Sequence, residues 1–513
     1  MLLMTLTLAT TAFVHRATLR VTPPLLEQLR RISTGRGGSS SSASSSGRSS
    51  GRSGTQDLKQ TAPMNFNVNG RSSARHAGPT MGADRVDEFA LTFLGTSSSA
   101  PSTDRNQQSL VMQFCGETWM FDCGEAAQHR IMSTTLSAPS IKRIFISHMH
   151  GDHWYGLPGM LCNMAAAYGG GEDGDIGKGK RPSLSGLRPH LPVEIVGPPG
   201  LRSAIRAVIG NSYATLGDMN IMIHELAGMR AIVAGPVKNT PPVTVARPLP
   251  NELPGLDLEP SADGVWSIPI RDHEPPVEMV AVELDHTVPT VGWVLTERPR
   301  PGRLDGARAK KALQAHGLPL KDLKILKAGQ PLPLPDGTAL EPADYVGPST
   351  QRRLAILSDM RDAKVNKTLL PLLQDATLLI HECTNAHLAS DPSDAGKSPL
   401  QTERRARRHG HSTPQMAGRL AAKVNAQHLV LTHFSPRYGS RHNHSVTMMS
   451  EIRSLAARQM APGPKQSVTT AVDLMRLEVS ITGQLEVQMP DEGLLASGGG
   501  RFVPQGAAAE LSP

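Results

Sequence analysis

The 513-residue chain has few aromatic residues, few cysteines and no long apolar run. Phe, Trp and Tyr make up 4% of it, while 48 glycines and 41 prolines favour an ordered core with long loop-rich additions. No apolar run reaches the roughly 18–20 residues that a membrane span needs, so we expect no membrane insertion. The four cysteines contain no Cys-x-x-Cys pair, which argues against a disulfide framework or a cysteine zinc site and predicts reduced thiols.

Acidic residues are nearly absent from the N-terminal part. Residues 1–56 hold seven arginines and one acid, and the rest of the chain carries 46 basic and 44 acidic residues, so the formal charge of +8 comes mainly from the N-terminus. With its serine-rich stretch, this composition predicts a transit peptide and linker over residues 1–86. We favour the chloroplast over the mitochondrion, and rank the cytoplasm and the nucleus below both. A secretory signal and an unaddressed tail are the alternatives.

Short apolar runs that end in glycine, histidine or an acid predict strands. These runs are 88–95, 109–124 (a hairpin turning at Gly116-Glu117), 141–148, 193–200, 278–286, 352–359, 376–382 and 426–433, with helices over 201–210 and 413–425. Stretches rich in Gly or Pro predict insertions at about 169–192 and 237–262, and residues 491–513 a flexible tail. One ordered domain over residues 87–490 remains. Strands that alternate with helices favour a layered α/β sandwich whose site lies along one sheet edge.

The sequence SHMHGDHWYGLPG places four potential metal ligands directly after a predicted strand: His148, His150, Asp152 and His153. Neutral imidazoles and carboxylates suit zinc or manganese. The two-residue spacing points the first two histidines the same way, and the glycine-allowed turn brings the other two ligands toward a second metal. Two metals about 4 Å apart stabilise a phosphoryl transition state. A histidine-rich surface loop is the alternative, and the preceding β-run argues against it.

Four ligands are too few for two metals, so other strand ends must supply more. His286, Asp359 and His433 each stand at the end of an apolar run and are the candidates. A lone histidine is more often structural than a ligand, but three candidates in the same setting favour metal binding.

Further motifs resemble ribonuclease Z, the tRNA 3′-processing endonuclease of the metallo-β-lactamase superfamily. In the family's order these are FLGTSSSAPSTDRNQQS, FDCGEAAQHRI, SHMHGDHWYGLPG, GPPG, DHTVPTVGW, HECTN and GHSTPQMA…LVLTHFSPRY, which together span roughly residues 88–438. The resemblance implies an αβ/βα four-layer sandwich with a projecting basic arm. It also implies a zinc-dependent endoribonuclease that removes the 3′ trailer from precursor tRNA and leaves a 3′-hydroxyl on the tRNA.

The resemblance assigns the metal ligands to two zinc ions per subunit, with manganese as the alternative metal. One ion would be held by His148, His150 and His286, the other by Asp152, His153 and His433, and Asp359 would bridge both. The chain departs from the family beside the bridging aspartate. It has Ser358-Asp359-Met360 where the family usually has Gly-Asp-Thr.

The resemblance also implies catalytic roles. Asp152 would orient or deprotonate the attacking water, and His411, steered by Glu382, would protonate the leaving 3′ oxygen. A helix cap and a buried polar pair are the alternative for His411 and Glu382. Asp122 would support the metal loop through hydrogen bonds without binding metal.

A basic segment lies between His286 and Asp359. Residues 298–327 carry nine basic and two acidic residues, and in ribonuclease Z this interval holds an arm that grips tRNA, here expected over 298–340. The expected phosphate contacts are Arg298, Arg300, Arg303, Arg308, Lys310, Lys311, Lys321, Lys324 and Lys327. A solvated basic loop is the alternative. Four more arginines in the run 402–410 either hold the acceptor stem or form an exposed helix face.

Two other functions stay open. Another hydrolase of the superfamily, such as a phosphodiesterase or an arylsulfatase-like enzyme, would share the metal site but would not need the basic segment. A catalytically silent RNA-binding paralogue would have no chemical reason to keep seven ligands. Similarity to the family's short form implies a homodimer.

Overall fold

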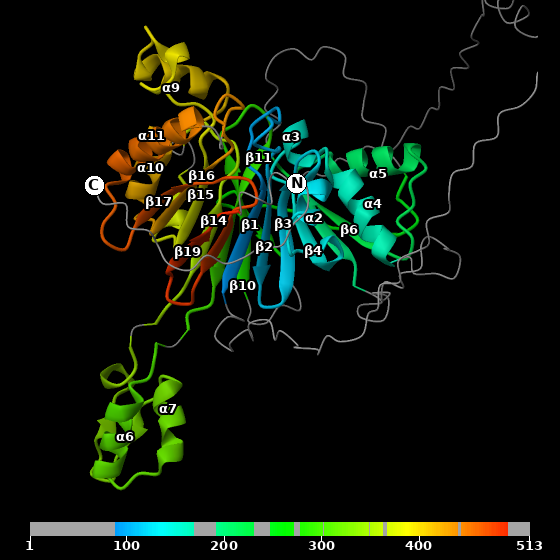
Figure 1. Cartoon of the computed structure of the whole chain (residues 1–513). Coiled ribbons are helices and arrows are strands. Elements are labelled where there is room, and N and C mark those ends of the chain that lie inside the picture. Colours follow the sequence, from blue (N-terminus) through cyan, green and yellow to red (C-terminus); the bar gives the residue numbers. More distant parts are fainter. Residues whose placement is uncertain are drawn as a thin grey trace, which may run out of the picture. The chain divides into compact units, whose positions relative to one another are not determined.

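The computed structural model describes residues 88–168, 191–229, 247–270, 277–300, 302–347, 349–362, 367–439 and 443–490. The predicted transit peptide, residues 169–190 of the first insertion, residues 237–246 of the second insertion and the tail after residue 490 lie outside the described residues. Two mixed sheets stand at the centre, with helices on their outer faces (Figure 1). The predicted α/β sandwich is confirmed.

The first sheet has the strand order β19-β18-β1-β2-β3-β4-β5-β6-β7, and β8 also pairs with β6. Strands β3 to β6 run parallel to one another, so their carboxyl ends share one edge. The bounds are β1 (Phe89–Gly95), β2 (Ser109–Phe114), β3 (Glu117–Cys123), β4 (Ile141–Phe145), β5 (Val193–Gly197), β6 (Ile221–Leu226), β7 (Glu252–Leu253), β8 (Asp257–Leu258), β18 (Arg476–Val479) and β19 (Leu485–Gln488).

The second sheet has the order β17-β16-β15-β14-β11-β10-β9. Strands β14 to β17 are parallel, and β10 runs in the same direction as β14 because both are antiparallel to β11. The carboxyl ends of β10, β14, β15 and β16 therefore share one edge. The bounds are β9 (Val265–Ile268), β10 (Val277–Leu284), β11 (Thr290–Glu297), β14 (Arg353–Ile356), β15 (Leu378–Glu382), β16 (His428–Thr432) and β17 (Ser467–Thr470).

Three apolar clusters hold the four layers together. The middle cluster lies between the sheets and joins residues of both, such as Phe145 of β4 and Trp293 of β11, whose ring centroids are 5.2 Å apart. The other two pack helices on the outer faces, α2, α4 and α5 on the first sheet and α10 and α11 on the second (Figure 1). Each fully buried large side chain contributes about 1.5–3 kcal/mol. The helices are α2 (Ala127–Met132), α3 (Gly151–Trp154), α4 (Leu157–Tyr168), α5 (Leu201–Asn211), α8 (Leu369–Leu373), α9 (Pro399–Arg408), α10 (Pro414–Lys423) and α11 (Asn443–Met460).

The basic segment folds around an apolar core of its own. Helix α6 (Gly306–Ala315) begins at Asp305, whose side chain accepts a hydrogen bond from the Arg308 amide. Helix α7 (Leu323–Lys327) and the hairpin of β12 (Leu332–Pro333) with β13 (Ala339–Leu340) complete the unit. Its core contains Ala309, Leu313, Leu326, Leu332, Leu334 and Leu340. We call residues 298–347 the arm.

Three details differ from the sequence predictions. The arm continues past residue 340, because Tyr345 packs on its core and Leu304 bridges Val346. Residues 247–262 are not merely an insertion, since β7 and β8 extend the first sheet through backbone pairing with β6. The hairpin turns at Cys115-Gly116, one residue earlier than predicted, because these two residues have the positive φ angles, 47° and 77°, that a tight turn needs.

Among the described residues, no helix combines the length and the hydropathy that a bilayer crossing requires.

Candidate metal centre

The strand ends bring all seven predicted ligands to one place between the sheets. His148, His150, Asp152 and His153 follow β4 of the first sheet, and His286, Asp359 and His433 follow β10, β14 and β16 of the second. The loop that follows β1 of the first sheet is joined to the loop that follows β16 of the second sheet by backbone hydrogen bonds. One of them runs from the Phe434 amide to the Thr96 carbonyl at 2.8 Å. All seven follow the carboxyl ends of strands that run in one direction within their sheet, which explains their convergence.

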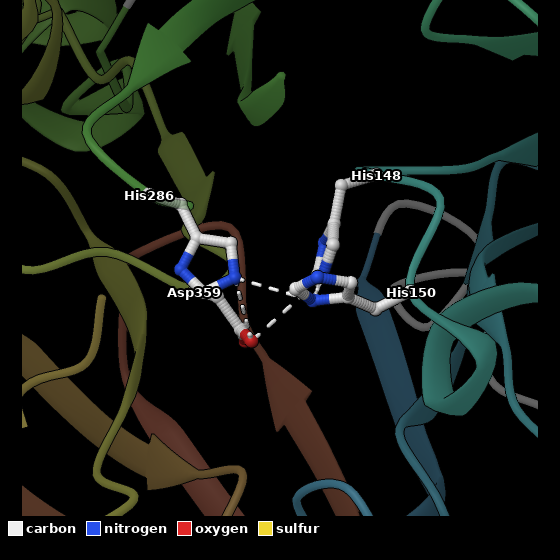
Figure 2. A group of neighbouring side chains, drawn as sticks. All are labelled: His148, His150, His286 and Asp359. Atoms are coloured by element: carbon white, nitrogen blue, oxygen red, sulfur yellow. Dashed lines mark hydrogen bonds and ion pairs between the residues drawn. The ribbon is translucent and has the colours of Figure 1, made fainter. Parts of the chain in front are cut away.

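One donor group consists of His148, His150, His286 and Asp359. In Figure 2 the three rings and the carboxylate point toward one another. Nδ1 of His150 lies 3.1 Å from Nε2 of His148 and 3.3 Å from Nε2 of His286. Oδ2 of Asp359 lies 3.8 and 3.7 Å from the same two Nε2 atoms. The four ligand atoms lie within 4.8 Å of one another, close enough to share one ion.

The second donor group consists of Asp152, His153 and His433. Nε2 of His433 lies 3.1 Å from Nε2 of His153 and 3.4 Å from Oδ2 of Asp152. Asp359 reaches this group through its other oxygen, with Oδ1 3.6 Å from Nε2 of His153 and 3.2 Å from Nδ1 of His433. Asp359 thus presents one carboxylate oxygen to each group, as a bridging ligand does. A third group shares Asp359 and His433 and adds His411.

The donors fit metal ions of the zinc type. Asp359 Oδ1 is buried and accepts no hydrogen bond from the described residues, which costs free energy unless a cation lies nearby. Two nitrogens bound to one tetrahedral zinc at about 2.1 Å would stand roughly 3.4 Å apart, close to the nitrogen spacings within both groups. Imidazole and carboxylate donors without thiolates suit zinc or manganese.

Hydrogen bonds from outside the groups orient the ligating rings. Nδ1 of His153 donates to Oδ2 of Asp122 at 2.7 Å, and Nδ1 of His286 donates to the Gly410 carbonyl at 2.7 Å. Each bond leaves the Nε2 atom of its ring without a proton and facing its donor group. Asp122 itself belongs to no donor group among the described residues, in line with the supporting role expected for it.

His433 has an unusual backbone conformation, with φ at 58°. This left-handed conformation costs a non-glycine residue roughly 1–2 kcal/mol and needs compensation. The next two amides of the chain, those of Phe434 and Ser435, donate to the carbonyls of Thr96 and Thr384 at 2.8 and 3.1 Å, and Arg105 stacks on the ring of Phe434 at 4.7 Å from its centroid. The loop after β16 is therefore held in the shape that points the His433 ring into the site.

Glu382 and His411 lie beside the donor groups. Nδ1 of His411 donates to Oε1 of Glu382 at 3.2 Å and lies 3.7 Å from Oδ2 of Asp359. Glu382 is fully buried and also accepts hydrogen bonds from the amides of Met360 and Thr384. The Glu382 carboxylate is thus fixed, and Nε2 of His411 is the ring nitrogen left for a ligand.

The charges of the site favour ionised carboxylates and a protonated His411. Burial alone would lower the pKa of His411, but the Glu382 carboxylate raises it to about 9. Burial raises the pKa of Asp152, yet the hydrogen bond from His433 and the nearby His153 hold it well below its usual range. Burial lowers the pKa of His286 to about 4, which keeps this ring neutral and able to bind metal.

Several residues that act at the site were not predicted from the sequence. The Ser99 amide donates to Oδ2 of Asp152 at 2.5 Å, and the Thr384 hydroxyl lies 3.0 Å from Nδ1 of His433. Ser147 binds both oxygens of Asp122. A backbone amide carries no residue-type signal, but Ser147 directly precedes His148 and Thr384 stands two residues after Glu382, and this closeness in sequence was an available signal.

The nine predicted RNA contacts lie in or next to the arm. Eight are exposed, and Arg300 is half-buried and paired with Glu297 at 3.0 Å. None of the five lysines pairs with a carboxylate in the described part of the chain. Of the arginines before His411, Arg407 pairs with Asp362 and Glu403, whereas Arg404, Arg405 and Arg408 are exposed on α9. Both alternatives for that run stay open.

A four-layer αβ/βα sandwich with two histidine-aspartate donor groups at one edge of its sheets has the architecture of a metal-dependent hydrolase of the metallo-β-lactamase fold. A family profile described as "Anti-Pycsar protein Apyc1" matches residues 89–171. Zinc phosphodiesterase ELAC protein 1 of Homo sapiens is 31% identical over 401 residues, which are 76% of this chain and 98% of that protein.

Ribonuclease Z of Picosynechococcus sp. is 32% identical over 352 residues, 68% of this chain and 86% of that protein. The crystal structure of human tRNase Z, short form (ELAC1), aligns with 75% of this chain and 98% of its own at 26% identity, with a TM-score of 0.44. These sequence relatives show that the chain belongs to the ribonuclease Z family, and they confirm the resemblance that the motifs indicate.

Proposed function

We propose that this protein is a zinc-dependent endoribonuclease that removes the 3′ trailer from precursor tRNA and leaves a 3′-hydroxyl on the tRNA. The observation that carries the proposal is the joint presence of two donor groups that share Asp359 and of His411, which is paired with Glu382 and has its Nδ1 3.7 Å from Oδ2 of that aspartate. Relatives named zinc phosphodiesterase and ribonuclease Z, which match most of the described residues, support the reaction class.

Two zinc ions per subunit agree with the two donor groups, with manganese as the alternative. When bound, the ions lower the pKa of water and stabilise charge on the phosphate. His148, His150 and His286 would hold one ion and Asp152, His153 and His433 the other, with Asp359 shared between them.

The remaining chemistry falls to side chains of the chain. The hydrogen bond from His433, the neighbouring His153 and the Ser99 amide hold Asp152 as a carboxylate, so it can accept a proton from, and orient, the attacking water. His411 carries a proton because Glu382 accepts from its Nδ1, and its Nε2 can give a proton to the leaving 3′ oxygen of the tRNA. The fully buried Glu382 sets the orientation of the ring.

The arm supplies the proposed grip on RNA. Its exposed lysines, which have no carboxylate partner among the described residues, lie on α6, α7 and the turn before α7, while the apolar faces of both helices are turned inward. Such cations contact phosphates without reading base sequence, which suits a substrate recognised by shape. We further propose that the protein forms a homodimer. We also propose that it is delivered to an organelle, with the chloroplast favoured, and the residues that would direct this delivery lie outside the described part of the chain.

The deciding experiment is incubation of the purified protein with a trailer-bearing precursor tRNA and zinc or manganese. The expected result is a cut directly after the discriminator nucleotide with a 3′-hydroxyl on the tRNA. An Asp152→Ala protein is the matched control, expected to lose cleavage and to keep tRNA binding. Hydrolysis of a small phosphodiester without cleavage of the precursor would refute the tRNA substrate.

A further inference from the structure

Ser358 is a buried serine whose hydroxyl joins the two sheets at the metal centre. It follows β14 and directly precedes Asp359, and its Oγ donates to Oγ of Ser147 over 2.8 Å. Ser147 follows β4 in the other sheet and directly precedes His148. The hydrogen bond therefore links the loop that presents the bridging carboxylate to the loop that presents four of the other donors.

The hydrogen-bonding capacity of Ser147 fixes the direction of this link. A serine hydroxyl has one proton to donate and two lone pairs that can accept. Ser147 Oγ donates to Oδ2 of Asp122 at 2.9 Å, because an ionised carboxylate can only accept. Its lone pairs are left for the Ser358 hydroxyl and for Nδ1–H of His148, 3.1 Å away. His148 then has no proton on Nε2, the atom that faces the first donor group.

Asp122 extends the same arrangement to the second donor group. Its Oδ2 also accepts from Nδ1 of His153 at 2.7 Å, so in the neutral ring, the form that binds metal, Nε2 beside His433 is the nitrogen without a proton. The Ser147 amide fixes the other oxygen of Asp122 at 2.7 Å. A single run of hydrogen bonds from Ser358 through Ser147 to Asp122 thus reaches one histidine of each group.

We propose that Ser358 is a positioning residue of the metal centre, whose hydroxyl acts through Ser147 to orient His148 and His153 while it ties Asp359 to them. Linked hydrogen bonds polarise one another, so donation by Ser358 strengthens the bond from Ser147 to Asp122. Residues that form hydrogen bonds with ligating histidines tune the metal affinity of a site. Ser358 lies one hydrogen bond further from the metal ligands than those residues. The inference rests on the proposed zinc site and not on the identity of the RNA.

The first test is the full-length Ser358→Ala protein, with zinc affinity measured by competition against a chromophoric chelator. We expect zinc affinity to fall roughly 3- to 10-fold. This loss is at or below the smallest one caused by removal of a residue that is hydrogen-bonded directly to a ligating histidine. In the cobalt(II)-substituted protein, the visible absorption bands are expected to shift, because the ligand geometry changes. Ser358→Gly gives the same test if the alanine protein does not fold.

The matched control is Ser109→Ala. Ser109 is a fully buried serine at the start of β2 whose hydroxyl has no hydrogen-bond partner among the described residues. We expect its replacement to leave zinc affinity and the cobalt spectrum unchanged, so a loss in the Ser358 variants cannot be assigned to removal of any buried hydroxyl.

A double-mutant cycle tests the route through Ser147. Ser147→Ala is expected to weaken zinc binding at least as much as Ser358→Ala, and adding Ser358→Ala to it is expected to cause no further loss. Unchanged affinity and spectrum in Ser358→Ala, or a fully additive loss in the double variant, would overturn the proposal. No readout uses RNA, so failure to cleave precursor tRNA would refute the proposed substrate and leave this test intact.

Discussion

Oε1 of Glu382 lies 3.2 Å from Nδ1 of His411, and the same carboxylate accepts hydrogen bonds from the amides of Met360 and Thr384. The backbone therefore holds Glu382 in place, and Glu382 holds the imidazole. This relationship gives the proposed proton donor an anionic partner that determines the pH range over which it stays protonated.

The first prediction concerns that pH range. Glu382→Gln removes the charge that raises the pKa of His411 to about 9, so this pKa falls. A general acid is active below its pKa and inactive above it. The alkaline limb of the single-turnover cleavage rate is therefore expected to move to lower pH. His411→Ala is expected to lose roughly 10²- to 10⁴-fold in rate with no such limb. An alkaline limb at the wild-type position in Glu382→Gln would contradict the assignment.

Gly410 carries the second prediction. Its φ is +84°, its carbonyl accepts from His286, and a Cβ on it would stand 2.5 Å from Nδ1 of His286. Gly410→Ala is expected to displace the His286 ring and lower zinc occupancy, measured by elemental analysis. Gly396→Ala is the matched control, because Gly396 has φ +75° but open space around its Cβ. Both variants should lose roughly 1–2 kcal/mol of stability, because alanine replaces glycine at a positive φ angle. Equal loss of zinc in the two variants would contradict the prediction.

The third prediction concerns the arm. Replacing Lys310, Lys311, Lys321 and Lys324 with Glu reverses four exposed charges that have no ionic partner among the described residues. Precursor tRNA binding is expected to weaken by roughly tenfold or more and to lose part of its salt dependence, because fewer counterions are released. Hydrolysis of a small phosphodiester should be unchanged. The control is a protein with Lys423→Glu and Lys465→Glu, two exposed positions outside the arm. Equal loss of tRNA binding and of small-phosphodiester hydrolysis in the arm variant would refute the arm's role.

The fourth prediction concerns the base of the arm. Arg352 is buried and binds both oxygens of Glu297, at 2.7 and 2.6 Å, and the Val479 carbonyl at 2.9 Å. Arg352→Met removes the buried partner of the Glu297 carboxylate and leaves it paired with the half-buried Arg300. We expect it to cost about 3 kcal/mol of stability in denaturant unfolding, the lower end of the range for breaking a buried ion pair. Arg352→Met with Glu297→Leu should recover most of that loss. A double variant as unstable as the single one would show that the pair contributes a net attraction.

The sequence predicted the strands and the convergence of their ends better than it predicted the connections. Apolar runs such as 376–382 and 426–433 became β15 and β16 because buried parallel strands are nearly continuously apolar. Strands β7 and β8 have two residues each, too short for any periodicity, and their place in the sheet depends on backbone pairing with β6.

The candidate site was predictable where ligand chemistry selects residue types. Histidine and aspartate at strand ends stand out from an apolar background, and the structure brings all seven together. The supporting groups were less visible, because a serine hydroxyl, the Ser99 amide and the Gly410 carbonyl acquire their roles only through distances between remote segments. The altered residue beside Asp359 was noticed in the sequence, but its partner Ser147 was not.

The two ends of the arm are joined by backbone pairs between Arg300 and Thr350 and between Leu304 and Val346. A segment whose ends meet and whose apolar core is its own can be lengthened, shortened or exchanged as a cassette, since the entropy of closing the loop rises only slowly with its length. Under the RNA-binding role proposed for the arm, selection can therefore change which RNA is held without altering a metal ligand. The proposed RNA binding by the arm and the cleavage at the metal centre can evolve at separate rates.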